Sequence, residues 1–177
     1  NTADCDLAVV EGGMGYYDGL GGVSTDGSTY DVARTLSMPS VLIVNSRGAS
    51  LSVLATIKGF LSFREDSQIR AVILNQVYAQ LKPLIEQELG VQVLGYVPKL
   101  TDLNLESRHL GLVLPGEIEA LKEKLKRLAA ALEETLALDE LLRLAEMTEP
   151  INYEEPKLPV LEHSGKIAVA ADDAFCF

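Results

Sequence analysis

The sequence has few of the residues that support disulfide, redox or zinc chemistry. It contains two cysteines, two histidines and no tryptophan among 177 residues. Cys5 and Cys176 lie near opposite ends of the chain, with no CxxC pair, so neither a disulfide framework nor a cysteine-based zinc site is indicated. We interpret both as ordinary thiols of a protein in the reducing cytoplasm.

Basic residues and long apolar runs are also scarce. The chain has 15 Lys and Arg against 26 Asp and Glu, which gives a formal net charge of -11. A chain this acidic repels phosphate backbones, so we expect no nucleic-acid partner. No apolar run approaches the roughly 20 residues that span a bilayer, and no secretory signal is evident, so we expect no membrane partner.

The phosphate-binding sequence GxxxxGK[ST] is absent from the chain. That loop supplies the backbone N–H groups and the lysine which hold nucleotide phosphates in P-loop proteins. What the chain does have is ample apolar sequence, because 47% of its residues are hydrophobic. That composition is ordinary for a globular domain with a buried core.

Short apolar runs alternate with segments of helical periodicity. The strands are predicted at residues 7–10, 41–44, 71–74, 91–96 and 167–170. The helices are predicted at residues 29–36, 51–63, 79–89, 117–134 and 140–147, with Gly90 ending the third and Asp139 capping the fifth. The first four runs lack polar alternation, as in strands that are covered on both faces. The pattern predicts an α/β fold with a parallel sheet.

The chain divides into three parts. Residues 1–147 carry the alternating pattern, and the helix at 117–134 has an apolar stripe that we expect to pack on the sheet, rather than to bind a partner. Residues 148–165 contain Pro150, Pro156 and Pro159 among scattered acids, a composition typical of a linker. Residues 166–177 open a new apolar run and stop at Phe177. We therefore interpret the chain as an excised piece that ends in the first strand of a second domain.

A glycine-rich segment follows the first predicted strand. Residues 11–19 read Glu-Gly-Gly-Met-Gly-Tyr-Tyr-Asp-Gly. Ligands of open parallel sheets bind where the strands end, and a carboxylate at that position is a natural ligand for Mg²⁺ beside phosphates. We therefore predict that Glu11 lies at the carboxyl end of a strand and takes part in binding, in preference to a solvated turn.

Other polar motifs come at or near predicted strand and helix ends. Ser28 or Thr29 can cap the first helix, and capping alone explains them as well as capping with a ligand does. Arg47 follows the second strand and is equally suited to a substrate anion or to the surface. Asn75 ends the third strand and can pair with a purine edge, a signal that is weak by itself.

Taken in order, these motifs resemble the cobyrinate a,c-diamide synthase family. The matching runs are VVEGGMGYYDG, DGST, SRGAS, VILNQV, GYVPK, ESRHLGL followed by PGE, and KIAVAADDAFCF. The resemblance covers nearly the whole chain. It implies a three-layer fold of the P-loop, dethiobiotin-synthetase-like type, whose part carrying the phosphate loop is missing here.

The resemblance also implies chemistry and residue roles. The family activates the a and c carboxylates of cobyrinate with ATP and Mg²⁺, and ammonia from glutamine then forms the amides. Glu11 would be the Mg²⁺ ligand and a catalytic residue, and Gly12 and Gly13 would lie near the phosphates. Asp18 would be catalytic and face the substrate, together with Ser28 and Arg47. Asn75 and Pro98 would line the adenine site, while Arg108 and His109 match the family without a physical role.

The departures from the family pattern limit what this chain can do alone. The phosphate loop would lie upstream and the glutaminase downstream, and Cys176 does not match the glutaminase nucleophile. We expect the chain by itself to be inactive, and its open sheet edge to favour a homodimer or a missing partner piece. Two alternatives stay open: a nickel-sirohydrochlorin a,c-diamide synthase, and a non-catalytic regulatory domain of the same fold that binds a small molecule.

Overall fold

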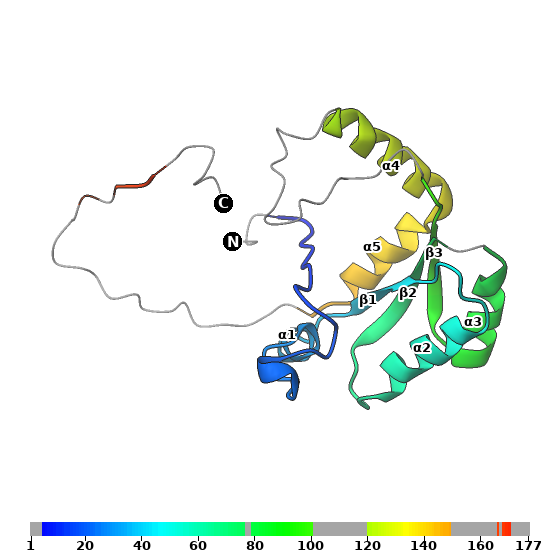
Figure 1. Ribbon diagram of the computed structural model, residues 1–177, viewed down its shortest axis with the longest axis horizontal. Helices are drawn as coiled ribbons and strands as arrows, with labels where there is room; N and C mark the ends of the chain where they lie inside the picture. Colours follow the sequence, from blue (N-terminus) through cyan, green and yellow to red (C-terminus); the bar gives the residue numbers. More distant parts are fainter. Residues whose placement is uncertain (1–4, 77–78, 101–119, 150–165, 167, 171–177) are drawn as a thin grey trace.

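The centre of the molecule is a parallel three-stranded sheet. The computed structural model describes residues 5–76, 79–100, 120–149, 166 and 168–170 (Figure 1). Its strands are β1 (Ser40–Asn45), β2 (Ile69–Asn75) and β3 (Gln92–Val97), paired in that order. The parallel α/β architecture predicted from the sequence is confirmed, and each of these strands overlaps its predicted run.

Helices cover both faces of this sheet. The helix α2 (Ser52–Ser62) joins β1 to β2, and η2 (Ala79–Leu81) followed by α3 (Lys82–Leu89) precedes β3. Ile57 and Ile85 from these helices are fully buried against Val72 on one face. On the other face, α5 (Leu138–Glu146) packs Leu144 onto Ile73. The result is the three-layer arrangement expected from the sequence, visible in Figure 1.

A bulge in β3 changes which residues face each layer. Val72 pairs with Val93, but the next residue, Ile73, pairs with Gly95, so Leu94 is the extra residue in β3. Gly95 has a φ of 140°, a backbone conformation that residues with a side chain rarely adopt. The bulge therefore places Tyr96 on the same face as Val93, toward α3, and leaves Leu94 facing α5.

The helix α1 (Thr29–Thr35) lies near the amino edge of the sheet, the edge at which the strands begin (Figure 1). A short turn, η1 (Leu20–Gly22), precedes it. Tyr30 and Ala33 are its buried residues, and the Tyr30 hydroxyl donates to Asp66 Oδ1 at 2.6 Å, shortly before β2 begins. The helix was predicted at 29–36, and its bounds agree to within one residue.

The prediction that the helix at 117–134 packs on the sheet is only partly correct. The helix α4 (Leu121–Thr135) has no buried residue and projects from β3 (Figure 1). It touches β3 through its carboxyl end, where Leu136 pairs with Gly95 and the Ala137 N–H donates to Leu94 at 2.7 Å. The predicted cap of α5 is wrong, because Ala137 occupies that position and Asp139 lies inside the first turn.

Two predicted strands do not form. Residues 7–10 have no strand structure, and Val9 is 87% exposed, because an apolar run becomes a buried strand only where a neighbouring strand and a covering layer accept it. Residues 168–170 likewise form no strand and are exposed, while residue 167 lies outside the described part. Arg108, His109, Cys176 and nearly all of the predicted linker also lie outside the described residues.

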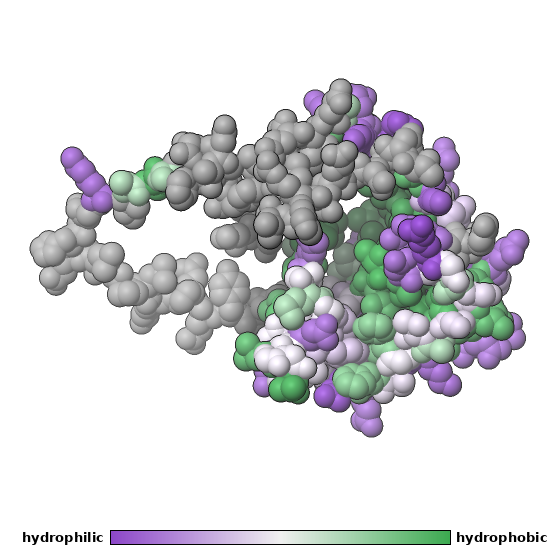
Figure 2. Space-filling model, in the orientation of Figure 1, coloured by the Kyte–Doolittle hydropathy of each residue, from purple (hydrophilic) through white to green (hydrophobic). Residues whose placement is uncertain are grey.

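Apolar and charged residues are separated on the surface. In Figure 2, hydrophobic residues gather toward the middle of the packed part, and most hydrophilic residues lie along its margin. Ile43, on the α5 side of β1, is 64% exposed, so α5 covers β2 and β3 more fully than β1. Within the described ranges, no helix combines the length and the hydrophobicity needed to cross a bilayer.

Candidate functional site

The carboxyl edge of the sheet, where the strands end, brings together three of the predicted site residues. Asn45 pairs with Asn75, and Asn75 pairs with Val97, which immediately precedes Pro98. The ladder continues past the strands, because the Ser46 N–H donates to the Asn75 carbonyl at 3.0 Å. Asn75, the last residue of β2, and Arg47 and Pro98, on the loops after β1 and β3, therefore lie at the same edge, as the parallel sheet predicts.

The loop after β1 is a tight polar turn that leaves Arg47 in solvent. The Asn45 Oδ1 accepts the Arg47 N–H at 3.2 Å, and the buried Ser46 hydroxyl donates to the Val44 carbonyl at 3.1 Å. Gly48 follows with a φ of 72°. An exposed guanidinium on a loop held in this way can form paired hydrogen bonds to a carboxylate or a phosphate.

The loop after β2 has a strained backbone. Gln76 has a φ of 63°, in the left-handed region that glycine and asparagine occupy more readily. Its N–H donates to the Val97 carbonyl at 2.9 Å, which ties the end of β2 to the end of β3. This hydrogen bond holds Asn75 and Pro98 next to each other.

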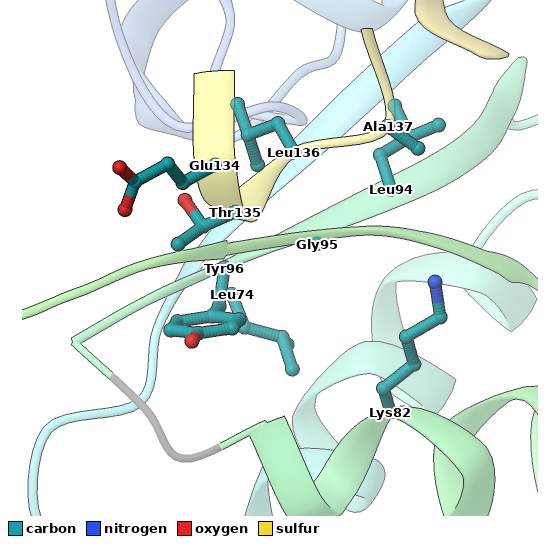
Figure 3. A pocket seen from close by; sticks show the side chains of 9 residues that line it. All are labelled: Leu74, Lys82, Leu94, Gly95, Tyr96, Glu134, Thr135, Leu136 and Ala137. Atoms are coloured by element: carbon teal, nitrogen blue, oxygen red, sulfur yellow. The ribbon is translucent and has the colours of Figure 1, made fainter. Parts of the chain in front are cut away.

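A hollow of about 290 Å³ lies beside this edge, around the end of β3. Figure 3 shows Tyr96, Leu74 and Lys82 on one side of β3, with Glu134 and Thr135 on the other. The end of α4 can approach β3 this closely because Gly95 has no side chain, and the Thr135 carbonyl lies where a Cβ would be. Tyr96 is half-buried and lies two residues before Pro98, whereas Leu74 is almost fully buried. Lys82 and Glu134 supply opposite charges.

The glycine-rich segment, residues 11–19, is held at the opposite edge of the sheet. The Tyr16 hydroxyl donates to the Ser67 carbonyl and lies 3.1 Å from the hydroxyl of Ser40, the first residue of β1. The Tyr17 hydroxyl donates to the Phe60 carbonyl in α2 at 2.6 Å. These contacts fix the segment where β1 and β2 begin.

The two tyrosines belong to an aromatic cluster with shifted ionisation. The Tyr17 ring lies 4.9 Å from Tyr16 and 4.9 Å from Phe63, measured between ring centroids. Burial, with Tyr16 as the next cause, raises the pKa of Tyr17 to about 12. Burial also raises the pKa of Tyr16. The phenols therefore stay protonated near neutral pH and act as hydrogen-bond donors.

Ser28 is the amino-terminal cap of α1, which confirms the capping prediction. It is 2% exposed, and its hydroxyl accepts the Asp31 N–H at 3.2 Å and donates to the Thr25 carbonyl at 2.6 Å. Asp31 in turn accepts the Gly27 N–H at 2.9 Å. This backbone hydrogen bond, helped by Arg34, lowers the pKa of Asp31. The Ser28 hydroxyl is thus engaged within its own loop.

Gly12, Asp18 and Ser28 are brought together around the start of α1. A side chain at Gly12 would collide with that of Thr29, and a side chain at Gly15 would collide with the Asp18 carboxylate. Asp18 itself is exposed, with its N–H donating to the Gly15 carbonyl at 2.9 Å. Gly13 is exposed, and no neighbouring atom lies in contact with the position that a side chain would take there.

The expected position of Glu11 at the carboxyl edge is wrong. Glu11 is exposed and precedes Gly12, which packs at α1 near the amino edge. The six residues of β1 separate the two edges by roughly 17 Å. The expectation failed because it depended on a strand at residues 7–10. In the part of the chain that the structure describes, no cluster of three or more His, Cys, Asp or Glu side chains could hold a metal ion.

A parallel sheet with helices on both faces is the architecture of α/β domains of the P-loop class. A family model described as an AAA domain matches residues 1–107, and the chain belongs to this family. No solved structure matches the chain.

More specific similarity comes from curated relatives named cobyrinate a,c-diamide synthase. The protein of Caldanaerobacter subterraneus subsp. tengcongensis is 38% identical over 100% of this chain, and that of Streptococcus sanguinis is 40% identical over 98%. The Clostridium acetobutylicum protein is 38% identical over 97%. This chain spans about 40% of the length of these relatives.

The structure adds residues that the sequence reading missed. Lys82, Glu134 and Thr135 line the hollow beside the carboxyl edge, although α3 and α4 carry no recognisable motif there. The sequence places Tyr96 only in the apolar run before Pro98. The signal that could have identified this place is Gly95, since a glycine inside an apolar strand often marks a bulge or a close approach.

Proposed function

We propose that this chain forms part of an ATP-dependent amide-forming enzyme that acts on the a and c side-chain carboxylates of cobyrinate, in the biosynthesis of cobalamin. The observation that carries the proposal is that 97–100% of the chain aligns with cobyrinate a,c-diamide synthases. The polar loops at the carboxyl edge support it, because ligands of parallel sheets bind there. A cytoplasmic location fits the chemistry.

The proposed reaction has two steps. A carboxylate oxygen of the substrate attacks the γ-phosphorus of ATP, so that ADP leaves and an acyl phosphate forms. Ammonia, released from glutamine by a glutaminase partner, then attacks the acyl carbon, and phosphate leaves as the amide forms. The protein's contribution to such steps is mainly positioning and electrostatic stabilisation of developing negative charge.

The residues at the carboxyl edge suit two of these tasks. The Asn75 amide has both a donor and an acceptor for a purine edge, and Pro98 is next to it. Tyr96, which is half-buried and lines the hollow, provides aromatic surface for a ring. Arg47, exposed on the loop after β1, is placed to bind a substrate carboxylate.

Glu11, Gly12, Gly13 and Asp18 are proposed for the phosphates, the Mg²⁺ ion and the substrate. One carboxylate fits Mg²⁺, since this ion commonly takes one or two protein carboxylates and completes its shell with phosphates and water. Ser28 is assigned to the substrate side of the same loop. These roles require the glycine-rich segment to leave the amino edge, and the hydrogen bonds of Tyr16 and Tyr17 are what it must break.

The decisive experiment replaces the matching segment of the Caldanaerobacter synthase with this chain. We expect the chimera to consume ATP and to form cobyrinate amides when glutamine is supplied. Arg47→Ala should raise the KM for cobyrinate about 10-fold, the loss of one charged hydrogen bond, while Lys58→Ala on the exposed side of α2 should change nothing. A folded chimera without cobyrinate-dependent ATP consumption would contradict the proposal.

A second test concerns the chain by itself. Nucleotide affinity in P-loop proteins comes largely from the loop's N–H groups, its lysine and Mg²⁺ acting together. We therefore propose that the isolated chain, which lacks GxxxxGK[ST], is inactive and binds Mg-ATP only weakly. Isothermal titration calorimetry measures this directly, and micromolar affinity would overturn the proposal of an inactive chain.

A further inference from the structure

The helix α4 is an amphipathic helix whose packing against the described elements is with β3. It comprises 15 residues and none is buried, and Leu125 on its apolar side is 51% exposed. It contacts β3 through its carboxyl end and then projects away from the sheet (Figure 1). Leu121, Leu128 and Leu132 on the same side are half-buried, so the apolar side of α4 is covered only in part. Apolar helix surface that stays exposed in this way is typical of an interaction surface.

The apolar residues of α4 have the spacing of a coiled-coil seam. Leu121, Leu125, Leu128 and Leu132 follow one another at intervals of four, three and four residues. Alternating intervals of four and three residues are those of the a and d positions of a heptad, which keep a stripe facing a second helix. The stripe therefore favours a helix as the partner of α4.

The charges of α4 are divided between its two halves. Residues 121–128 contain four basic side chains and one acidic one, a net charge of +3. Residues 129–135 contain Glu133 and Glu134 and no basic residue, a net charge of -2. A helix with this division is complementary to a copy of itself that runs in the opposite direction, since each basic half then faces an acidic half.

We propose that α4 is the contact surface of a homodimer in which the α4 helices of two copies of this chain pair antiparallel. Pairing Leu121 with Leu132 of the second copy also pairs Leu125 with Leu128 of that copy, so all four leucines meet a leucine. Lys122 and Glu133 lie on the same flank of the stripe, and this register brings each close to the other in the second copy. The second copy is favoured over another partner because it supplies both the leucines and the opposite charges.

The interface is small, so the dimer should be weak. Two helices of 15 residues share about 22 Å of length, which is near the lower limit for a stable specific contact. We expect the mass in sedimentation equilibrium to rise from 19.1 kDa toward twice that value as the concentration increases from about 10 μM to about 1 mM, a range typical of weak interfaces.

Substitutions in the stripe test the surface. Leu125→Glu should abolish the rise in mass while leaving the circular dichroism and the unfolding midpoint of the monomer nearly unchanged, because no residue of α4 belongs to the core. Ala130→Glu is the matched control, since it introduces the same charge on the exposed opposite side of α4, and it should leave the association intact. Equal losses in both variants would overturn the proposal.

A charge exchange tests the antiparallel arrangement. Lys122→Glu alone and Glu133→Lys alone should each weaken association several-fold, and the double exchange should restore it, because position 122 of one copy faces position 133 of the other. A parallel pair would place each position beside itself and would not be restored. A chain that stays at one monomer mass up to 1 mM, or a double exchange without restoration, would also overturn the proposal.

Discussion

Gly95 is the residue on which the joint between the sheet and α4 depends. Its φ of 140° and the Thr135 carbonyl, which approaches where a Cβ would lie, leave no room for a side chain. We expect Gly95→Ala to lower the free energy of unfolding by about 2–4 kcal/mol, from backbone strain together with displacement of the α4–α5 junction. Urea denaturation monitored by circular dichroism measures the change.

Gly59 provides a control substitution, for which we expect the free energy of unfolding to change in the opposite direction. It lies in α2, is exposed, and has open space where a Cβ would be added. Gly59→Ala should therefore raise the free energy of unfolding by about 0.5–1 kcal/mol, since alanine restricts the unfolded chain and suits a helix. If Gly95→Ala were as benign as Gly59→Ala, the bulge described for β3 would be incorrect.

The raised pKa of Tyr17 predicts that the protein loses stability in alkaline solution. Its pKa is raised to about 12 by burial, whereas a tyrosine in the unfolded chain ionises near pH 10. The unfolded state therefore loses its proton first, so stability is unaffected below pH 10 and falls as the pH rises from 10 toward 12. The decrease in urea midpoint over this range should be smaller in Tyr17→Phe than in the wild type.

The same variant has a second effect at neutral pH. Removing the hydroxyl deletes its hydrogen bond to the Phe60 carbonyl, which should cost about 1 kcal/mol. Amide hydrogen exchange in residues 11–19 should become faster, because one of the two tyrosine anchors is lost. Identical alkaline titrations of the unfolding midpoint in both proteins would show that Tyr17 ionises as it does in water.

At the scale of elements, α1 depends on its cap. It has only seven residues, too few to be stable without capping and tertiary contacts. Ser28→Ala removes the acceptor for the Asp31 N–H and the donor to the Thr25 carbonyl, so we expect a loss of about 1–2 kcal/mol in unfolding free energy. Ser24→Ala, which loses one exposed hydrogen bond to the Asp26 N–H in the same loop, should cost well under half as much.

This pair of variants also bears on the role of Ser28. In the chimeric synthase, a purely structural Ser28 would lower the melting temperature in Ser28→Ala and leave the KM for cobyrinate unchanged. An increase in KM at temperatures where the chimera is fully folded would instead support the proposed contact with substrate. The two readouts separate a capping hydroxyl from one that also meets a ligand.

The elements that the sequence predicts well are those whose partners are near in the chain. β1, β2 and β3 alternate with α2 and α3, so each apolar run finds a parallel neighbour within one crossover. Residues 7–10 are equally apolar, but periodicity reports suitability for burial and not the presence of a neighbouring strand. For the same reason the apolar stripe of α4 did not reveal that Leu125 would stay exposed.

The residues of the candidate site likewise fall into those whose position the sequence predicts and those whose position it does not. Arg47, Asn75 and Pro98 follow strands that do form, and parallel strands necessarily end at one edge, so their proximity could be predicted. Glu11 was placed through a strand that does not form. The hydrogen bonds of Tyr16 and Tyr17 to Ser67 and Phe60 connect residues 43 or more positions apart, and no local pattern announces contacts of that range.

At the scale of the whole molecule, stability is concentrated in the middle strand. Ala71, Val72 and Leu74 of β2 are at most 1% exposed, and β2 is paired on both sides. Residues 7–10 are exposed and form no strand. Local openings differ in free energy across such a structure, and amide exchange reports the difference.

We therefore expect hydrogen–deuterium exchange followed by mass spectrometry to show the slowest uptake in peptides from β2, with β1 and β3 less protected because each lies at an edge of the described sheet. Peptides that cover residues 7–10 should exchange at nearly the rate of an unfolded chain. Protection of those residues comparable to that of β1 would mean that the apolar run before Glu11 finds a strand partner in solution. Glu11 would then follow a strand and lie at the carboxyl edge, beside Asn75 and Pro98.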